Sequence, residues 1–467
     1  MNLARYEPPA PVSRAVLAVI LVIAVLLRFP SLGEQSLWRD EAATWLQVNG
    51  SLADVIARTA TDNYPPLYNL LAWISVQLFG GAEWVLRLPS AVLGVLNVAL
   101  LYGLGTRIGG RGVGLIAAAL LTLSGYHVWY SQEARMYALL ACTATAHAWT
   151  VVHFLDRPRA ARALLLGLSG IPLVYAHPYG ALTWVGIGFG ALWTIVQRRD
   201  WRSLLQLVLA ELLVVLSFVP WGLILIGRAK SIADQGFWIG EPTPGYILLQ
   251  WRKVTSALYI LLVLAIPFLT FLRRRNGPGP AAGALPLLLS WTLVPSILGI
   301  IASVLVEPVF FDRYLIGSLP GFLVLFALAL LMPARTSRQV VLASAVALVV
   351  GVATLLFADA KPRQDWRPTI AELRAISQPD DCLAMSYPWD RSVLDYYAPQ
   401  LGACFMSAID PGSIAAVPAS ARIIYLAMQP SDEVAAAVAP LARLRPLLTT
   451  RPVHNGELYI FGPLSPG

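Results

Sequence analysis

The sequence contains few charged residues, and this scarcity excludes most soluble architectures. Asp, Glu, Lys and Arg make up 13% of the 467 residues, whereas hydrophobic residues make up 57%. A soluble domain carries roughly 25% charged residues. The mean hydropathy of +0.65 and repeated apolar runs of about 20 residues indicate an α-helical protein that crosses a lipid bilayer many times.

Cysteine is also scarce, with three residues in the whole chain. Cys142 lies inside an apolar run, where packing is its plainest role. Cys382 and Cys404 both lie near the C-terminus, so a disulfide in an oxidising compartment and two free buried thiols are both open. The chain also lacks tandem repeats, and residues 12–32 lack the small-residue motif of a signal-peptide cleavage site. We therefore expect the first apolar run to be retained as a span.

The net charge of +8 at pH 7 reflects membrane topology and does not indicate nucleic acid as a partner. Most basic residues fall in short segments between apolar runs, and cytoplasmic loops are enriched in Lys and Arg. Placing all these segments on one side requires about eleven spans, of which the eighth precedes Arg273. The N-terminus is then cytoplasmic in a multi-pass protein of the plasma (inner) membrane. Residues 64–79 are too short to span and are predicted to lie at the outer interface.

The last quarter of the chain differs in composition from the rest. Charge and proline content rise there, and the apolar runs become shorter. Strand patterns occur at 382–386, 422–428 and 458–461, and helical patterns at 370–376 and near 432–443. We therefore predict two domains: a transmembrane domain at 1–358, and a small extracytoplasmic α/β domain at 359–467.

Several charged residues are predicted to lie at the outer face of the membrane. Each alone has a plain explanation: an acidic pair at a helix start, an aspartate in a turn, or an ion pair at a span end. Their location on one face favours a catalytic site. The residues are Asp40, Glu41, Asp62, Arg87, Glu133, Arg135, Asp312 and Arg313.

Carboxylates beside guanidinium groups at a membrane face suit one type of reaction. A lipid-phosphate leaving group needs Arg or a divalent cation, and an attacking hydroxyl needs a carboxylate base. Nearby aromatic residues can stack on a sugar, although Trp and Tyr are also typical of the membrane interface. The aromatic residues in question are Trp38, Tyr64, Tyr68, Tyr130 and Tyr137.

Four ordered motifs resemble the GT-C glycosyltransferases. The resemblance is to the protein O-mannosyltransferase-like group, which includes lipid A aminoarabinose transferases and rhizobial lipopolysaccharide-core sugar transferases. It implies a multi-span fold with interfacial helices in the first outer loop. It also implies inverting transfer of a sugar from a polyprenyl-phosphate donor to a hydroxyl acceptor on a lipid, glycan or protein. The motifs are Trp38-Arg39-Asp40-Glu41, Asp62-Asn63-Tyr64-Pro65-Pro66, Arg87-Leu88-Pro89-Ser90 and the run from Tyr130 to Tyr137.

The resemblance further implies roles for individual residues. Asp40 would be the catalytic base beside Glu41, and Asp62 and Glu133 would hold the acceptor or a cation. Arg135 and Arg313 would bind the donor phosphate. Aromatic character and position, and not the resemblance, indicate the residues that would line the sugar or the lipid: Trp38, Tyr64, Tyr68, Tyr137, Phe310 and Phe311.

Two questions stay open at this point. A divalent cation is one, with Asp40, Asp62 and Glu133 as candidate ligands; Tyr64 stands where many relatives have His, which weakens the case for a metal there. The other is a transporter or flippase for a lipid-linked glycan. Such a protein would place several charges along a path within its spans, and Glu211 is essentially the one such charge. For Glu211 a hydrogen bond between helices is the favoured interpretation.

Overall fold

The computed structural model describes residues 8–234, 239–255, 280–331, 336–356, 365–428, 432–454 and 456–464. The predicted eighth span lies outside the described residues. The chain forms two compact units. Unit 1 comprises Met1–Leu32, Gly50–Gly80 and Arg87–Ala360, and unit 2 comprises Gly33–Asn49, Gly81–Leu86 and Lys361–Gly467.

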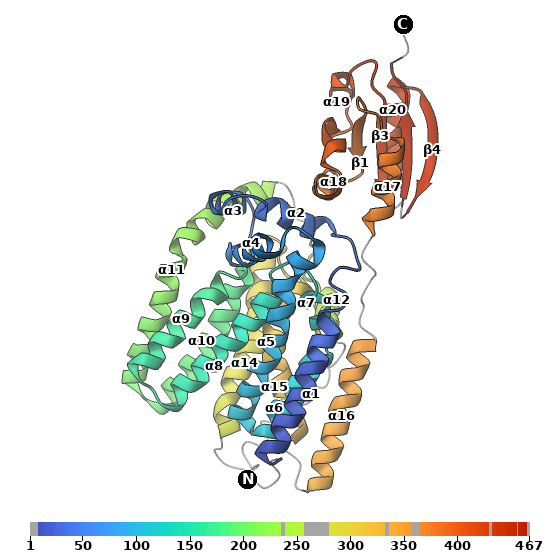
Figure 1. The fold of residues 1–467 in the computed structure, drawn as a ribbon. Coiled ribbons are helices and arrows are strands. Elements are labelled where there is room, and N and C mark those ends of the chain that lie inside the picture. The colour runs from blue at the N-terminus through green and yellow to red at the C-terminus, as the bar shows by residue number, and fades with distance from the viewer. Residues whose placement is uncertain are drawn as a thin grey trace. The chain divides into compact units, whose positions relative to one another are not determined.

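Unit 1 is helical (Figure 1). Its longer helices are α1 (Ala10–Arg28), α5 (Glu83–Gly109, whose first turn belongs to unit 2), α8 (Tyr137–Asp156), α10 (Pro178–Arg198), α11 (Trp201–Asp234), α14 (Pro280–Leu305) and α16 (Ser337–Leu356). The shorter ones are α3 (Leu52–Thr59), α4 (Leu67–Phe79), α6 (Arg111–Leu123), α7 (Gly125–Ser131), α9 (Ala160–Val174), α12 (Pro244–Thr255), the 3₁₀ helix η2 (Asp312–Ser318) and α15 (Leu319–Leu331).

The helices of unit 1 are those of a multi-pass membrane protein. Within the described ranges, eight helical segments are long and apolar enough to cross a membrane, and the bent pair α6–α7, with an angle of 63°, makes a ninth. Helix α9 has 15 residues and α4 has 13, fewer than the roughly 20 that a span needs. The expected polytopic helical class is therefore confirmed, while the total of eleven spans stays a prediction.

A buried arginine stabilises the break between α6 and α7. The Arg28 guanidinium at the end of α1 donates hydrogen bonds to the carbonyl oxygens of Leu121 (3.1 Å) and Thr122 (3.3 Å). Thr354 of α16 donates to the carbonyl oxygen of Leu123 (3.2 Å). The last carbonyls of a helix have no partner within it, and leaving them unpaired in hydrocarbon is costly. These bonds hold α7, which leads directly into the last of the four sequence motifs.

Unit 2 contains a five-stranded sheet with the order β2-β1-β3-β5-β4. The strands are β1 (Cys382–Met385), β2 (Phe405–Met406), β3 (Ile423–Met428), β4 (Leu447–Val453) and β5 (Gly456–Phe461). β1 is parallel to β2 and β3, and β5 is antiparallel to β3 and β4. The helices are α2 (Arg39–Val48), α17 (Trp366–Ile376), η3 (Pro388–Asp390), α18 (Arg391–Tyr397), η4 (Pro399–Gly402), α19 (Pro411–Ala416) and α20 (Asp432–Leu444). The predicted small α/β fold is confirmed.

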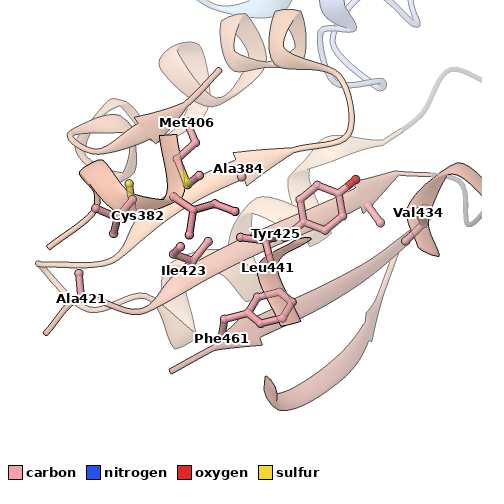
Figure 2. Packing of buried hydrophobic residues seen from close by; sticks show 12 residues of the cluster. Cys382, Ala384, Met406, Ala421, Ile423, Tyr425, Val434, Leu441 and Phe461 are labelled. Carbon is pink, nitrogen blue, oxygen red and sulfur yellow. The ribbon is translucent and has the colours of Figure 1, made fainter. Parts of the chain in front are cut away.

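The core of unit 2 lies at the centre of this sheet (Figure 2). Cys382, Ile423 and Phe461 are fully buried there, and Tyr425 is 1% exposed. A disulfide joins Cys382 to Cys404, so the structure adopts the bridged alternative of the two that the sequence left open. The bridge links β1 to the residue before β2, the shortest strand of the sheet.

Candidate functional site

The predicted site residues of unit 1 meet in a cluster of cationic and aromatic side chains. The Cζ atom of Arg135 lies 4.9 Å from the ring centre of Tyr64. The Cζ atom of Arg313 lies 5.6 Å from the ring centre of Tyr137 and 5.3 Å from that of Phe311. All three distances fall within the range of about 6 Å for a cation–π interaction. Five residues that were expected from the sequence to bind or line the donor are therefore brought together.

Two residues that the sequence interpretation missed complete this cluster. The ring of His177 lies 5.2 Å from that of Tyr64 and 4.8 Å from that of Tyr314. The hydroxyl oxygens of Tyr64 and Tyr314 are 3.5 Å apart, and Arg313 Cζ lies 5.7 Å from the Tyr314 ring centre. His177 lies between the apolar segments of α9 and α10, and no motif surrounds it. Its position at the end of an apolar segment was the only signal for it in the sequence.

Each member of the cluster lies at or near the end of a helical element. Tyr64 precedes α4, Arg135 lies between α7 and α8, and Tyr137 begins α8. His177 is the N-cap of α10, where its Nδ1 accepts a hydrogen bond from the backbone N–H of Tyr179 (2.9 Å). Side chains at helix ends are fixed by capping and tertiary contacts, so helices far apart in sequence supply one site.

Two buried hydroxyls hold the backbone of the last motif in place. The Tyr68 hydroxyl of α4 lies 3.0 Å from Ser90 Oγ of α5 and 3.4 Å from the carbonyl oxygen of Glu133. Ser90 Oγ donates to the carbonyl oxygen of Arg135 (3.1 Å). Tyr68 is 1% exposed, so in this structure it supports the segment that carries Arg135; its expected lining role stays a prediction.

The acidic candidates of unit 1 have different surroundings. Asp62 lies in a turn, where its Oδ1 accepts from the Asn63 backbone N–H (2.6 Å). Glu133 and Asp312 are buried. Among the described residues, no group of three or more His, Cys, Asp and Glu side chains gathers as a metal ion would require. The divalent cation, with Asp40, Asp62 and Glu133 as candidate ligands, stays an open question of the sequence.

Asp40 and Glu41 lie in the first turn of α2, in unit 2. The buried Glu41 carboxylate accepts a hydrogen bond from the backbone N–H of Trp38, the N-cap residue (3.4 Å). This is half of a capping box, and negative charge is favourable at a helix N-terminus. The structure thus gives Glu41 the helix-start role that the sequence left open, and it leaves the Asp40 carboxylate half-buried beside it.

Arg39 links α2 to the C-terminal part of unit 2. Its Nε lies 2.6 Å from Asp390 Oδ1, and its Cζ lies 5.3 Å and 5.5 Å from the ring centres of Tyr387 and Trp389. Burial raises the pKa of Asp390, the bond to Arg39 opposes the rise, and the nearby charge of Asp40 adds to it. The candidate base Asp40 therefore lies within electrostatic range of an ion pair whose carboxylate is buried.

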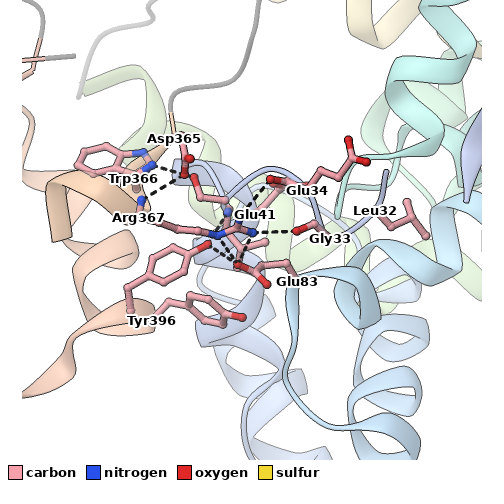
Figure 3. A network of polar contacts seen from close by, with 12 residues as sticks. Leu32, Gly33, Glu34, Glu41, Glu83, Asp365, Trp366, Arg367 and Tyr396 are labelled. Carbon is pink, nitrogen blue, oxygen red and sulfur yellow. Dashed lines mark hydrogen bonds and ion pairs between the residues drawn. The ribbon is translucent and has the colours of Figure 1, made fainter. Parts of the chain in front are cut away.

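A second network anchors the segment that precedes α2 (Figure 3). The Arg367 guanidinium of α17 donates to Glu83 Oε1 and to the carbonyl oxygens of Gly33 and Glu34, each at 2.9 Å. The Tyr397 hydroxyl of α18 also donates to Glu83 Oε1 (2.9 Å). These bonds join residues from both short segments of unit 2 to its C-terminal part. They fix the backbone at Gly33 and Glu34, a few residues before Asp40.

Glu211 belongs to neither of these arrangements. Its Oε2 accepts a hydrogen bond from Trp184 Nε1 at 2.5 Å, which connects α11 to α10. The favoured interpretation, a hydrogen bond between helices, is confirmed.

Comparisons with known proteins agree with this architecture. A family model described as dolichyl-phosphate-mannose-protein mannosyltransferase matches residues 63–224, which include Tyr64, Arg135 and His177. No curated protein sequence matches the chain.

Solved structures that resemble the protein include the following three. ArnT from Cupriavidus metallidurans in the apo state matches with a TM-score of 0.64 and 13% identity, over 96% of this chain and 98% of that one. The same protein bound to undecaprenyl phosphate matches with 0.54 and 14%, over 95% and 97%. The apo oligosaccharyltransferase from Archaeoglobus fulgidus matches with 0.54 and 13%, over 87% and 65%. The resemblance expected from the sequence is confirmed, and the chain has the GT-C fold.

Proposed function

We propose that the protein is a membrane-embedded inverting glycosyltransferase. It moves a sugar from a polyprenyl-phosphate donor to a hydroxyl group of a lipid, glycan or protein acceptor at the extracytoplasmic face of the inner membrane. The observation that carries this proposal is the gathering of Arg135 and Arg313 over aromatic rings, where apolar helices end. The fold is shared with an ArnT that was solved with undecaprenyl phosphate bound, which supports a donor of that class.

The cluster of unit 1 has the chemistry that a lipid phosphate requires. A guanidinium binds two phosphate oxygens at once, and it does so in a fixed plane. Aromatic rings around it exclude water and lower the local dielectric, which strengthens the attraction between opposite charges. Phe310 is fully buried, whereas Phe311 beside Arg313 is half-buried, so Phe311 offers apolar surface to a prenyl chain next to the cationic group.

The proposed reaction is a single displacement at the anomeric carbon. The Asp40 carboxylate takes the proton of the acceptor hydroxyl as its oxygen forms the new glycosidic bond. The bond between the anomeric carbon and the phosphate oxygen breaks, and polyprenyl phosphate leaves with the electron pair. Arg135 and Arg313 stabilise the negative charge that the leaving phosphate gains. Attack from the side opposite the leaving group inverts the anomeric centre.

Purified protein in detergent provides the test. With a polyprenyl-phosphate-linked sugar and an extract of envelope acceptors, we expect release of polyprenyl phosphate at the rate at which labelled sugar appears in acceptor. We also expect undecaprenyl phosphate alone to bind and to inhibit. Movement of an intact lipid-linked glycan across proteoliposomes, without cleavage, would instead favour the flippase alternative.

A further inference from the structure

His177 presents a buried nitrogen that the fold itself does not use. The side chain is 1% exposed, and its Nε2 atom has no hydrogen-bond partner among the described residues. Its other ring nitrogen, Nδ1, accepts from the backbone N–H of Tyr179. Because an amide N–H can only donate, Nδ1 carries no proton, and the neutral ring must carry its proton on Nε2. Nε2 is therefore a hydrogen-bond donor.

The ring is neutral at physiological pH. Burial lowers the pKa of His177 well below its usual value of 6.5, and the positive charges of Arg135 and Arg313 lower it further. Arg135 lies over Tyr64 and Arg313 over Tyr314, and these two rings flank His177. A neutral N–H donor thus lies among positive charges, and an imidazolium is disfavoured there.

The surroundings of His177 select the kind of atom that completes its hydrogen bond. Tyr64 and Tyr314 flank the ring and have hydroxyls near each other. The guanidinium groups of Arg135 and Arg313 and the Nε2–H of His177 are all able to bind an oxygen with negative charge. A buried donor without an acceptor costs free energy, so Nε2–H of His177 favours a ligand that brings such an oxygen.

We propose that His177 binds the donor substrate directly, with Nε2–H donating a hydrogen bond to a phosphate oxygen that Arg135 and Arg313 also contact. This inference rests on the proposed function and deepens it, because it adds a neutral donor to the two cations. A neutral imidazole gives up no proton in the reaction. Its hydrogen bond strengthens as the phosphate gains charge on leaving, which assists the same bond cleavage.

Two substitutions separate this role from packing. His177→Gln keeps an N–H donor near the position of Nε2, whereas His177→Phe keeps a ring between Tyr64 and Tyr314 and removes the donor. For binding of undecaprenyl phosphate to the full-length protein in detergent, we expect His177→Phe to weaken affinity by at least roughly tenfold, about 1.4 kcal/mol. We expect His177→Gln to stay within about threefold of the wild type, since charged acceptors gain from any well-placed donor.

Undecaprenol, which lacks the phosphate, is the matched ligand control. Undecaprenol should bind more weakly than undecaprenyl phosphate. Its affinity should be the same for the wild type, His177→Phe and His177→Gln, because the proposed hydrogen bond is to phosphate. Equal loss for both ligands, or equal loss in both variants, would assign His177 to packing and overturn the inference. A wild type that binds neither ligand would instead overturn the proposed function.

A measurement on the wild type covers the case in which His177→Phe does not fold. In protein with ¹⁵N-labelled histidine, the Nε2 resonance of His177 is assigned by its absence from the His177→Gln spectrum. Addition of undecaprenyl phosphate should shift this resonance and its proton downfield. An unchanged resonance at saturating ligand would contradict the inference.

Discussion

Aromatic rings lie beside Arg135 and Arg313 in unit 1, whereas three arginines of unit 2 join distant segments through carboxylates. The three ion pairs of unit 2 have distances of 2.6 to 2.9 Å, and Arg39 also lies over two rings. In unit 1, Arg107 pairs with Asp156 at 2.6 Å. An aromatic ring attracts a guanidinium without adding a charge of its own. The ion pairs of unit 2 are Arg39–Asp390, Arg367–Glu83 and Arg422–Asp381.

The ion pairs of unit 2 have a structural role. The pairs of Arg39 and Arg367 join segments that lie 351 and 284 residues apart in the sequence, so they shape unit 2. The cationic cluster of unit 1 provides the kind of site that an anionic lipid requires. Asp40 is the exception in unit 2, since it is a half-buried carboxylate that the proposed reaction uses.

The largest expected effect is the loss of turnover in Asp40→Asn. The amide is nearly isosteric but takes up no proton, and loss of a general base typically costs about 10²- to 10⁴-fold in rate. Binding of undecaprenyl phosphate, which we assign to unit 1, should be unchanged. Transfer of labelled sugar by the purified variant measures the first effect, and lipid binding measures the second.

Asp54→Asn is the matched control for this variant. Asp54 is an exposed acid in the first turn of α3, where it caps the helix through Ser51, and Asn also accepts hydrogen bonds. Transfer by Asp54→Asn should equal that of the wild type. Normal turnover in Asp40→Asn would contradict the assignment of Asp40 as the general base.

The second effect is a loss of stability that we expect to be confined to unit 2. Replacing Cys382 and Cys404 together by Ser opens a bridge between positions 22 residues apart, and a loop of that length is worth about 3 kcal/mol in the chain-entropy account. Amides of β1 and β3 should exchange with solvent roughly a hundredfold faster, which is that free energy expressed as a rate ratio. Cys142→Ala is the control. If the bridge variant also lost affinity for undecaprenyl phosphate, unit 2 would contribute to donor binding.

Much of unit 2 was predictable because its buried strands are continuous apolar runs. The segments 382–386, 422–428 and 458–461 were placed correctly as β1, β3 and β5. Strand β4 was missed because it is exposed along most of its length and contains Pro452, and β2 has two residues. The docking of Gly33–Asn49 against the C-terminal part was also missed, because it depends on contacts such as Arg39–Asp390 that no local pattern encodes.

The site was predictable where a motif carried it. Tyr64, Arg135 and Tyr137 stand in runs of unusual polarity at the ends of apolar segments, so their spacing drew attention to them. His177 has no such run around it, and its importance comes from packing against Tyr64 and Tyr314, which lie more than a hundred residues away on either side. Contacts between residues so far apart in the sequence arise from the packing of the folded helices, so the sequence pattern around His177 did not predict them.

The third effect compares one substitution in both units. Arg313→Lys replaces a planar group that contacts two phosphate oxygens by a point charge, and affinity for undecaprenyl phosphate should fall by at least roughly tenfold, about 1.4 kcal/mol. Arg422→Lys disturbs the pair with Asp381 and should lower the stability of unit 2 without changing lipid affinity. Unchanged lipid binding in Arg313→Lys would remove this residue from the donor site and leave Arg135 as the main cation.

The smallest effect tests the aromatic surroundings themselves. The ring of Phe311 has Arg313 Cζ at 5.3 Å and Lys253 Nζ at 5.4 Å from its centre, and such contacts contribute about 0.5–1 kcal/mol each where water has access. Phe311→Leu keeps apolar volume and removes the ring, so Arg313 should be less well positioned and lipid affinity should fall about two- to fivefold. Phe405→Leu removes the corresponding contact in unit 2, where Arg391 Cζ lies 5.1 Å from the ring centre, and should leave lipid affinity unchanged. Equal responses in the two variants would mean that the rings of unit 1 are interfacial packing, and that the ring beside Arg313 has no bearing on donor binding.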